Sequence, residues 1–201
     1  MDAWHWLSHD QTLRGGAPAP PDDVPLVHHG PLVLRGAGFH ASVGILDAMK
    51  YAPGPVVCRV DVGEERLGGP DKLVARVRTI RWRIDATAVL ERFLRRCAED
   101  VAHLWPMPGP VRRFLASGAD RDAAVRALAE CASVGPGRAA RAAAAQALTP
   151  VDAGSACSVA GSVACLARWA AWDDAGDEAD SELLARQSAR LAAWVTEAAG
   201  R

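Results

Sequence analysis

Three side chains that can carry chemistry lie within a short segment between residues 38 and 51. His40 can donate, accept or transfer a proton near neutral pH, and Ser42 follows it two residues later. Tyr51, the single tyrosine of the chain, offers a ring on which a flat ligand can stack. These residue types predict one wall of a ligand-binding cleft. The structural alternative is a histidine hydrogen-bonded within a strand-to-helix turn and a tyrosine ring that closes the edge of the core.

A second candidate is a run of basic residues between positions 72 and 83, which contains no acidic residue. Such a run can contact phosphate on a nucleotide or on nucleic acid. Side chains alternate between the two faces of a strand, so the arginines change face near Thr79, where we expect a β-bulge or a break. That split favours a small anion pocket that includes Arg78 over a continuous phosphate track. The alternative is a solvated face whose arginines pair with nearby aspartates. The run comprises Lys72, Arg76, Arg78, Arg81 and Arg83.

Other kinds of chemistry find no support in the residues. There is no Gly-rich phosphate loop ending in Lys and Ser or Thr, no G-x-S-x-G elbow and no cysteine next to a histidine in sequence. His5 and His9 have a metal-ligand spacing only on a helix, and the Trp4–Leu7 pattern is extended. We therefore expect no metal site.

Composition narrows the class of protein. The chain has 201 residues, half of them apolar, and its 23 Lys and Arg residues nearly balance its 24 Asp and Glu residues. It can bury a sizeable core, and it has no global charge that would attract nucleic acid or a membrane. Five cysteines without a CxxC pair predict reduced thiols. No signal peptide or apolar membrane span is recognisable, so the sequence predicts a cytoplasmic protein.

The elements that must position the candidate residues are mostly short strands. Asp85 is expected to cap a long helix that begins after the last strand. The segment from Gly15 to Pro25 is rich in Gly, Pro and Asp and predicts a mobile loop. Ser42 is expected to cap a helix of roughly ten residues. The predicted strands are Trp4–Leu7, Pro31–Leu34, Val56–Val62 and Leu73–Ile84.

The second half of the chain is alanine-rich and predicts a helical layer. The Pro- and Gly-rich stretch 105–110 marks a boundary between an α+β domain, 1–105, and a helical domain, 110–201. The acidic stretch 173–180 is expected to be a solvated linker. The predicted helices are 110–117, 120–133, 137–148, 155–172 and 181–198, with Gly135-Pro136-Gly137 as one separator. The larger residues expected in their core are Leu166, Trp169, Trp172, Leu184, Leu191 and Trp194.

The first half resembles a widespread group of uncharacterised bacterial and phage proteins with a "G-[LF]-H-A-S, D-A-x-x-Y-A-P-G, C-R-V" core. The likeness covers about residues 4 to 104 and implies no activity. Its quoted segments in this chain are 38–42, 47–54 and 58–60, followed by Asp71-Lys72-Leu73-Val74 and Arg78-Thr79-Ile80-Arg81-Trp82.

A more distant resemblance is to the ADP-ribosyltransferase fold. Gly38, His40 and Tyr51 fall where the poly-ADP-ribosyltransferase branch has its Gly, its first Tyr and the Tyr that stacks on nicotinamide. His5 falls near the position of an N-terminal His or Arg of that fold. The resemblance implies a mixed sheet with a nucleotide cleft. The chain departs from the fold's pattern at the catalytic Glu of a late strand, because residues 73–84 contain no acid.

Two functions are expected from these observations. The first is recognition of a nucleotide such as NAD, with or without transfer of ADP-ribose. The second is a non-enzymatic module that binds a protein, for example in phage and host conflict, through its arginine strand or its helical half, which is also a candidate for self-association. Nucleic acid and membranes are not expected partners. The ligand-binding residues expected for the first function are His5, His40, Ser42, Tyr51 and Arg78.

Overall fold

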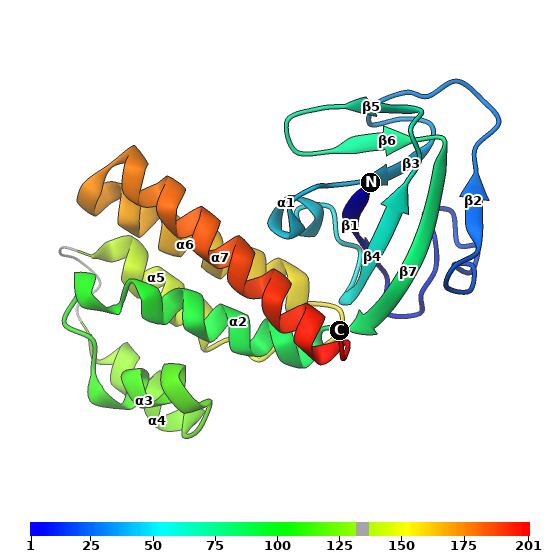
Figure 1. Cartoon of the computed structure of the whole chain (residues 1–201). Helices are drawn as coiled ribbons and strands as arrows, with labels where there is room; N and C mark the ends of the chain where they lie inside the picture. Colours follow the sequence, from blue (N-terminus) through cyan, green and yellow to red (C-terminus); the bar gives the residue numbers. More distant parts are fainter. Residues whose placement is uncertain (132–136) are drawn as a thin grey trace. The chain divides into compact units, whose positions relative to one another are not determined.

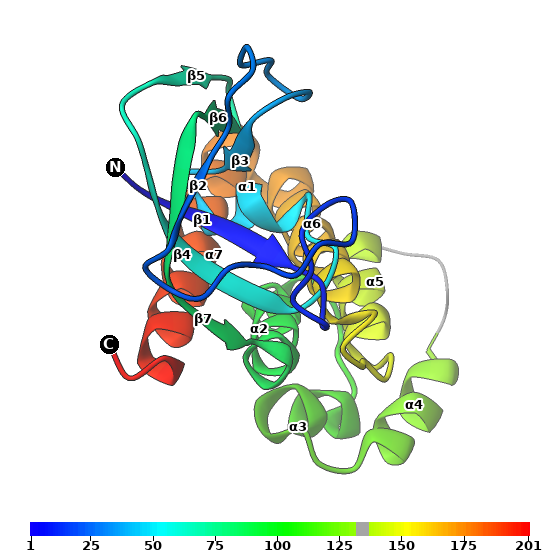
Figure 2. The same cartoon turned by 90° about the vertical axis from the view of Figure 1, so that its right-hand side faces the viewer.

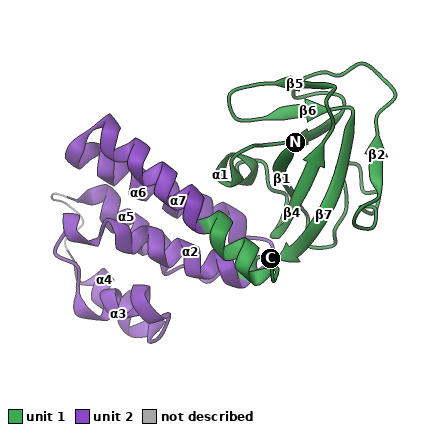
Figure 3. Ribbon diagram, viewed as in Figure 1, with its two compact units in different colours: residues 1–87, 191–201 green, residues 88–190 purple. Residues whose placement is uncertain are grey.

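The computed structural model describes residues 1–131 and 137–201. The chain forms two compact units, residues 1–87 with 191–201 and residues 88–190 (Figure 3). The strands of the described chain all lie in the first unit, and helices make up most of the second (Figure 1). The predicted α+β class, with an N-terminal sheet followed by helices, is confirmed. The division at 105–110 into separately folding domains stays a prediction.

The first unit contains a four-stranded antiparallel sheet in the order β1-β4-β7-β2. Strands β1, β4 and β7 lie side by side in both views of the molecule (Figures 1 and 2). The short β2 pairs with the first part of β7. The strands are β1 (Asp2–Leu7), β2 (Pro25–Val27), β4 (Val56–Val62) and β7 (Val77–Asp85).

A second antiparallel sheet has the order β3-β6-β5. Its strands are β3 (Phe39–Ala41), β5 (Arg66–Gly68) and β6 (Leu73–Ala75), and the short helix α1 (Ile45–Met49) follows β3. Two backbone hydrogen bonds, of 2.8 and 3.0 Å, join Trp4 to Ser42 and so connect β1 to the end of β3. This bridge places the segment around His40 beside His5.

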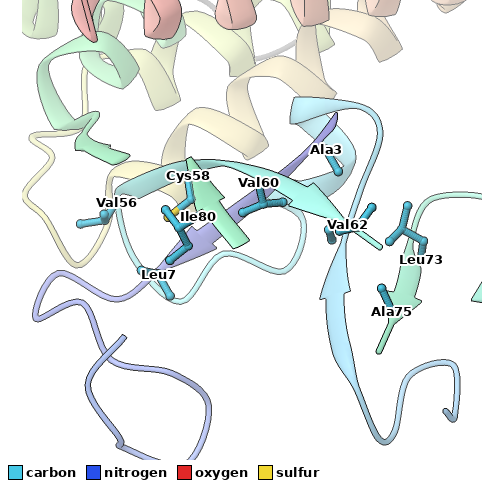
Figure 4. Packing of buried hydrophobic residues seen from close by; sticks show 10 residues of the cluster. Ala3, Leu7, Val56, Cys58, Val60, Val62, Leu73, Ala75 and Ile80 are labelled. Atoms are coloured by element: carbon cyan, nitrogen blue, oxygen red, sulfur yellow. The ribbon is translucent and has the colours of Figure 1, made fainter. Parts of the chain in front are cut away.

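Strand alternation produces an apolar inner face in the first unit. In β4, residues 56, 58, 60 and 62 are buried, whereas Arg59 and Asp61 between them are partly exposed. Residues of β1, β6 and β7 complete the same cluster (Figure 4). Period-two alternation puts His5 on this inner face too, because its neighbours two positions away, Ala3 and Leu7, belong to the cluster. The cluster is Ala3, Leu7, Ala41, Val56, Cys58, Val60, Val62, Leu73, Ala75 and Ile80.

The opposite face of the same sheet carries a row of aromatic and cationic side chains. Trp4, Arg59 and Trp82 are register partners across β1, β4 and β7. The guanidinium of Arg59 lies 4.6 Å from the ring centroid of Trp4, whose ring meets that of Trp82 edge-on at 5.9 Å. These cross-strand contacts stabilise the register that sets which residues point inward.

The long basic segment forms two strands instead of one. Arg76 separates β6 from β7, and the register between β4 and β7 shifts so that Arg59 faces Trp82 while Val60 faces Ile80. Arg81 is therefore the extra residue of a bulge, close to the predicted irregularity near Thr79. The break and the bulge decide which face each arginine takes.

Two local predictions in the first unit are wrong. Pro31–Leu34 is not a strand, because the loop closes on itself through hydrogen bonds from Gly36 N to Val33 O and from Val33 N to Ala37 O. The helix near His40 has five residues, with Gly44 at its N-cap position. Ser42 does not cap it, since its backbone is bridged to β1.

The prediction of a mobile loop for residues 15–25 needs correction at the end of the segment. Its end, Pro25, begins the edge strand β2. Two aspartates just before that strand bind arginines of β7, Asp22 to Arg83 and Asp23 to Arg81. These ion pairs fix the segment against the sheet.

The second unit consists of helices. Helix α2 begins at the boundary with the first unit, and Asp85 accepts a hydrogen bond of 2.8 Å from the backbone N–H of Thr87, as a cap should. Helices α5 and α6 pack against each other through buried alanines. The helical elements are α2 (Thr87–Asp100), the 3₁₀ turn Ala102–Leu104, α3 (Gly109–Ser117), α4 (Arg121–Ala129), α5 (Arg138–Ala147), α6 (Ala156–Ala175) and α7 (Asp177–Ala198).

Three expectations for the helical half need correction. Trp169, Trp172 and Leu184 are not core residues: they are 61%, 49% and 36% exposed, while Leu191 is buried. The acidic stretch 173–180 is helical except at Gly176, where α6 ends and α7 follows. The predicted helix 120–133 corresponds to α4, and its last residues, together with Gly135 and Pro136, lie outside the described residues.

Within the described part of the chain, no helix combines the length and apolarity needed to cross a membrane.

Gly38, which leads into β3, has a backbone that a side chain would disturb. Its φ is +111°, and a Cβ there would lie 2.6 Å from Val74 Cγ2 and 2.9 Å from Leu32 Cδ2. We expect Gly38→Ala to lower the free energy of unfolding by about 1–3 kcal/mol, measured by denaturant titration. The matched control is Gly68→Ala, because nothing lies within 4 Å of a Cβ at that position. Equal stability of the two variants would contradict this account of Gly38.

Candidate functional site

The first unit contains a cleft with a volume of about 630 Å³. Its size falls in the range of protein sites for small molecules and cofactors. β1 and β3, the loops that follow β1 and precede β3, the end of α1 and the start of β7 all contribute to its lining. The structure brings all five sequence-predicted site residues together in this lining, namely His5, His40, Ser42, Tyr51 and Arg78.

Arg78 is a buried guanidinium, with only 3% of its surface exposed. Its Nη1 donates a hydrogen bond of 2.8 Å to the carbonyl oxygen of His40, and its guanidinium lies 5.4 Å from the ring centroid of Phe39. Burial lowers the pKa of Arg78 to about 10, so the group is still a cation at neutral pH. A buried cation is costly unless an anion compensates it.

The outer edge of this guanidinium has no partner among the described residues. The Nε of Arg78 is buried without a hydrogen-bond acceptor, and its Nη2 makes no hydrogen bond or ion pair. In Arg168 of the second unit, the same two nitrogens bind both carboxylate oxygens of Asp180, at 2.8 and 2.7 Å. Arg76 binds Glu65 through the same edge. Arg78 therefore has unused hydrogen-bonding capacity of the kind that binds an oxyanion in a bidentate manner, held below the surface of the free protein.

The remaining arginines of the basic run form ion pairs with nearby acidic residues, as the alternative interpretation of the sequence expects. Arg76 pairs with Glu65, and Arg81 contacts Asp23 and Asp61. Arg83 pairs with Asp22 and also donates to the carbonyl of Pro20. These pairs lie away from the cleft lining and stabilise the sheet and its loops. Of the four arginines, Arg78 is the one that reaches the cleft.

Three further cations complete the cleft: Arg14, Arg35 and Lys72. Arg14 and Arg35 are exposed, Lys72 is half-buried and Arg78 is buried, so the cations form a series from the rim to the interior. The described lining contains no aspartate or glutamate. Asp71 lies next to this lining and offsets part of its charge, because one of its oxygens is 3.9 Å from Nη2 of Arg35. The four cations still outnumber it, and a concave surface with an excess of cations attracts anions.

His5 and His40 provide polar groups beside Arg78. Burial, followed by the charge of Arg78 and the neighbouring His40 and Lys72, holds the pKa of His5 well below its usual range. The pKa of His40 is also lowered, first by its burial and then by Lys72, Arg78 and Arg14. Both imidazoles are therefore neutral at pH 7 in the free protein.

The neutral form of His40 has an assigned tautomer. The backbone N–H of Arg35 donates to Nε2 of His40 at 3.1 Å, so the ring proton is on Nδ1. Because Nδ1 is then a donor, His40 adds an N–H group to the cations of the cleft. His40 is thus hydrogen-bonded to the loop before β3 and not within the strand-to-helix turn, and it also lines the cleft. Its role toward a ligand stays a prediction.

Tyr51 lies at the rim, where it is 44% exposed. Its hydroxyl donates to Asp71 at 2.8 Å, and the ammonium group of Lys72 lies 3.2 Å from its ring centroid. Lys72 therefore covers one face of the ring. A ligand ring could therefore stack only on the other face of Tyr51. The stacking role that the resemblance implies for this residue stays a prediction.

Ser42 and Cys58 have structural roles near the site. Ser42 is buried and its backbone forms the bridge to Trp4, so it holds β1 and β3 together. Cys58 pairs with His5 in the register of β1 and β4 and is fully buried. Burial raises the pKa of the Cys58 thiol to about 12, which leaves it uncharged and unreactive.

Sequence reasoning missed Arg14 and Arg35 as site residues and treated Lys72 only as part of the basic run. Arg14 and Arg35 each precede a glycine in a loop, and such a pattern does not show where a loop side chain points. Arg35 has a φ of +67°, a conformation that is uncommon for a residue other than glycine. Strained residues of this kind concentrate at functional sites.

Comparison with protein-family models, curated proteins and solved structures finds no match to this chain. The resemblances stated from the sequence therefore stay predictions. Any function proposed for the chain rests on the geometry and charge of the cleft.

The unpaired edge of Arg78 leads to a stability prediction. Arg78→Met keeps most of the side-chain volume and removes the buried charge, so we expect the free energy of unfolding at neutral pH to rise by about 1–2 kcal/mol. Because the pKa of Arg78 in the folded protein lies below that in the unfolded chain, the charge destabilises the fold at every pH below about 10.

The control for this measurement is Arg76→Met, which breaks the pair with Glu65 and two hydrogen bonds to the carbonyl oxygens of His28 and Gly30. We expect that variant to be less stable than the wild type. If Arg78→Met were destabilised to the same extent as Arg76→Met, the guanidinium of Arg78 would have to be compensated within the protein.

The lowered pKa of His5 predicts a pH dependence. The unfolded chain takes up a proton on this residue as the pH falls below about 6.5, while the folded protein does not, so acid reduces the free energy of unfolding. His5→Gln should show a shallower decline between pH 7 and pH 5, roughly the window set by the unfolded histidine. The exposed His29→Gln is the control and should follow the wild type. Parallel curves for all three proteins would show that His5 does not resist protonation.

Proposed function

We propose that the first unit recognises a nucleotide of the NAD and ADP-ribose type and binds its phosphates in the cleft. The observation that supports this most is the buried Arg78, whose Nε and Nη2 edge finds no acceptor among the described residues. Arginine forks of this kind match the oxygen spacing of phosphate and carboxylate groups. The burial cost of the charge is offset when such an anion arrives.

The rest of the lining favours a phosphate-bearing nucleotide over a small carboxylate. The described lining has four cations and no acid, and the neighbouring Asp71 pairs with only one of them, Arg35, so the excess charge calls for more than one negative charge in the ligand. The volume of about 630 Å³ exceeds the needs of a single small anion and leaves room for a sugar and a base. Phe39 and Tyr51 contribute aromatic surface to the same lining, which suits a flat base.

Recognition is a better proposal than transfer of ADP-ribose. Transfer develops positive charge on the ribose, which a nearby carboxylate stabilises. Glu65 is engaged by Arg76, and neither it nor Glu64 belongs to the cleft lining. A cleft lined by cations stabilises the phosphates and opposes a cationic transition state. We therefore propose binding as the function and do not assign an enzymatic reaction.

The test is calorimetric titration of the intact protein with ADP-ribose and NAD⁺, together with thermal melting. We expect saturable binding, and a stabilisation of about 2.7 kcal/mol at a ligand concentration of 100 Kd. Arg78→Met should lose binding although it stays folded, and Arg76→Met should keep it. Tyr51→Ala should weaken binding, because it removes ring surface at the rim. Binding that survived in Arg78→Met would contradict the proposed site.

A second candidate function rests on the second unit. Trp169 and Trp172 are three residues apart on α6, so they share a helix face, and both are largely exposed. Exposed tryptophans are enriched at protein interfaces. If no nucleotide binds the wild type, while a concentration-dependent association is lost on replacing Trp169 and Trp172, protein binding or self-association becomes the better account.

A further inference from the structure

We propose that the group held by Arg78 is a terminal phosphate, joined to the rest of its ligand through one oxygen only, so that the cleft prefers a nucleotide ending in phosphate to the dinucleotide NAD⁺. This inference rests on the proposed nucleotide function and narrows its ligand class. Three observations carry it: the series of cations from rim to interior, the geometry of the free guanidinium edge, and the absence of carboxylates from the described lining.

The exposure of the four cations shows how a ligand must enter. Arg14 and Arg35 are exposed at the rim, whereas Arg78 is 3% exposed and hydrogen-bonded to the carbonyl of His40 on β3. A group that reaches Arg78 must therefore be narrow and must come at the end of its molecule. The pyrophosphate of NAD⁺ carries a nucleoside on both sides, so it cannot be the leading end. A terminal phosphate meets this requirement.

The donors at the inner end match the oxygens of a terminal phosphate. In the proposed complex the Nε and Nη2 edge of Arg78 takes two oxygens, as the same edge of Arg168 takes the two oxygens of Asp180. This requires the Arg78 side chain to shift toward the cleft, because its Nε is buried in the free protein. A terminal phosphate has a third oxygen, and the Nδ1–H of His40 and the ring of His5 lie in the same lining. A phosphate within a diester has fewer charged oxygens to offer to these donors.

Charge favours the same ligand. A terminal phosphate carries about −1.5 to −2 at pH 7, whereas a phosphate bridged on both sides, as in the pyrophosphate of NAD⁺, carries a single charge. NAD⁺ also brings a cationic nicotinamide ring. Among the described lining residues no carboxylate would pair with that ring, and Arg14, Arg35, Lys72 and Arg78 would repel it. The nicotinamide of NADH is uncharged, so the repulsion applies to the oxidised form alone.

The experiment compares two ligands that differ at one end. ADP and ADP-ribose share the adenosine and both phosphorus atoms, but in ADP-ribose the terminal phosphate is esterified by a second ribose. Calorimetric titration of the full chain at one pH and ionic strength should show ADP binding at least about tenfold more tightly than ADP-ribose. NADH should bind more tightly than NAD⁺. Arg76→Met should keep both preferences.

Protein variants test whether the cations in the interior of the cleft bind the terminal phosphate. In Lys72→Met, which removes a half-buried cation of the lining, ADP should lose more affinity than ADP-ribose, whereas Arg78→Met should lose binding of both. Equal binding of ADP and ADP-ribose, or tighter binding of ADP-ribose, would overturn the inference and leave the proposed nucleotide function standing. Failure of all four nucleotides to bind would overturn both. Inorganic phosphate that displaced ADP at an equal concentration would show that the nucleoside is not recognised, which also overturns the inference.

Discussion

The structure of the first unit depends on how it accommodates one charge, the guanidinium of Arg78 in an apolar interior. Its neighbours on the inner face are aliphatic residues, the uncharged Cys58 and His5, whose pKa Arg78 helps to lower. The protein offers it one backbone acceptor, the carbonyl of His40, and the π-face of Phe39. This is less than a buried cation requires. The other cations of the cleft increase the cost, because like charges are gathered without an acid in the described lining. The free protein is therefore less stable than its core would allow, and an anion that binds there recovers that free energy.

Strand geometry explains why Arg78 points inward while Arg76 and Arg81 do not. Arg76 occupies the break between β6 and β7. Its guanidinium group there donates hydrogen bonds to the carboxylate of Glu65 and to the backbone carbonyl oxygens of His28 and Gly30. The bulge at Arg81 then adds one residue to β7, which shifts the face on which the following side chains lie. Arg78 lies between these two irregularities and opposite Val62, which belongs to the inner cluster. A regular strand over the whole segment would have kept Arg76 and Arg78 on one face.

Period-two alternation and capping chemistry allowed much of the fold to be predicted from the sequence. The strand Val56–Val62 was predicted at its observed bounds, and Asp85 was predicted to cap the helix that follows β7. These features depend on local patterns, so a single sequence contains them. Pro31–Leu34 has the apolar content of a strand, but hydrogen bonds within its own loop replace the pairing that a strand needs.

The candidate site was predictable where it depended on residue type and strand position. His5, His40 and Arg78 were expected near a ligand, and they line one cleft. Arg14 and Arg35 could not be assigned, because each lies in a loop whose path depends on tertiary contacts. The exposure of Trp169 could not be predicted either, because it also depends on tertiary contacts. Alanines fill the helical core, so this large apolar residue is left at the surface.

The cation-lined cleft also bears on the resemblance to ADP-ribosyltransferases. A transferase needs two electrostatic environments in one site, positive around the phosphates and negative beside the ribose that loses its nicotinamide. In this chain the positive part is present in Arg14, Arg35, Lys72 and Arg78, while the described lining supplies no carboxylate for the negative part. The feature that supports the proposed phosphate binding therefore works against the bond-breaking step. The ligand that we propose, a nucleotide ending in phosphate, has no bond to nicotinamide, so its binding does not require a carboxylate at this position.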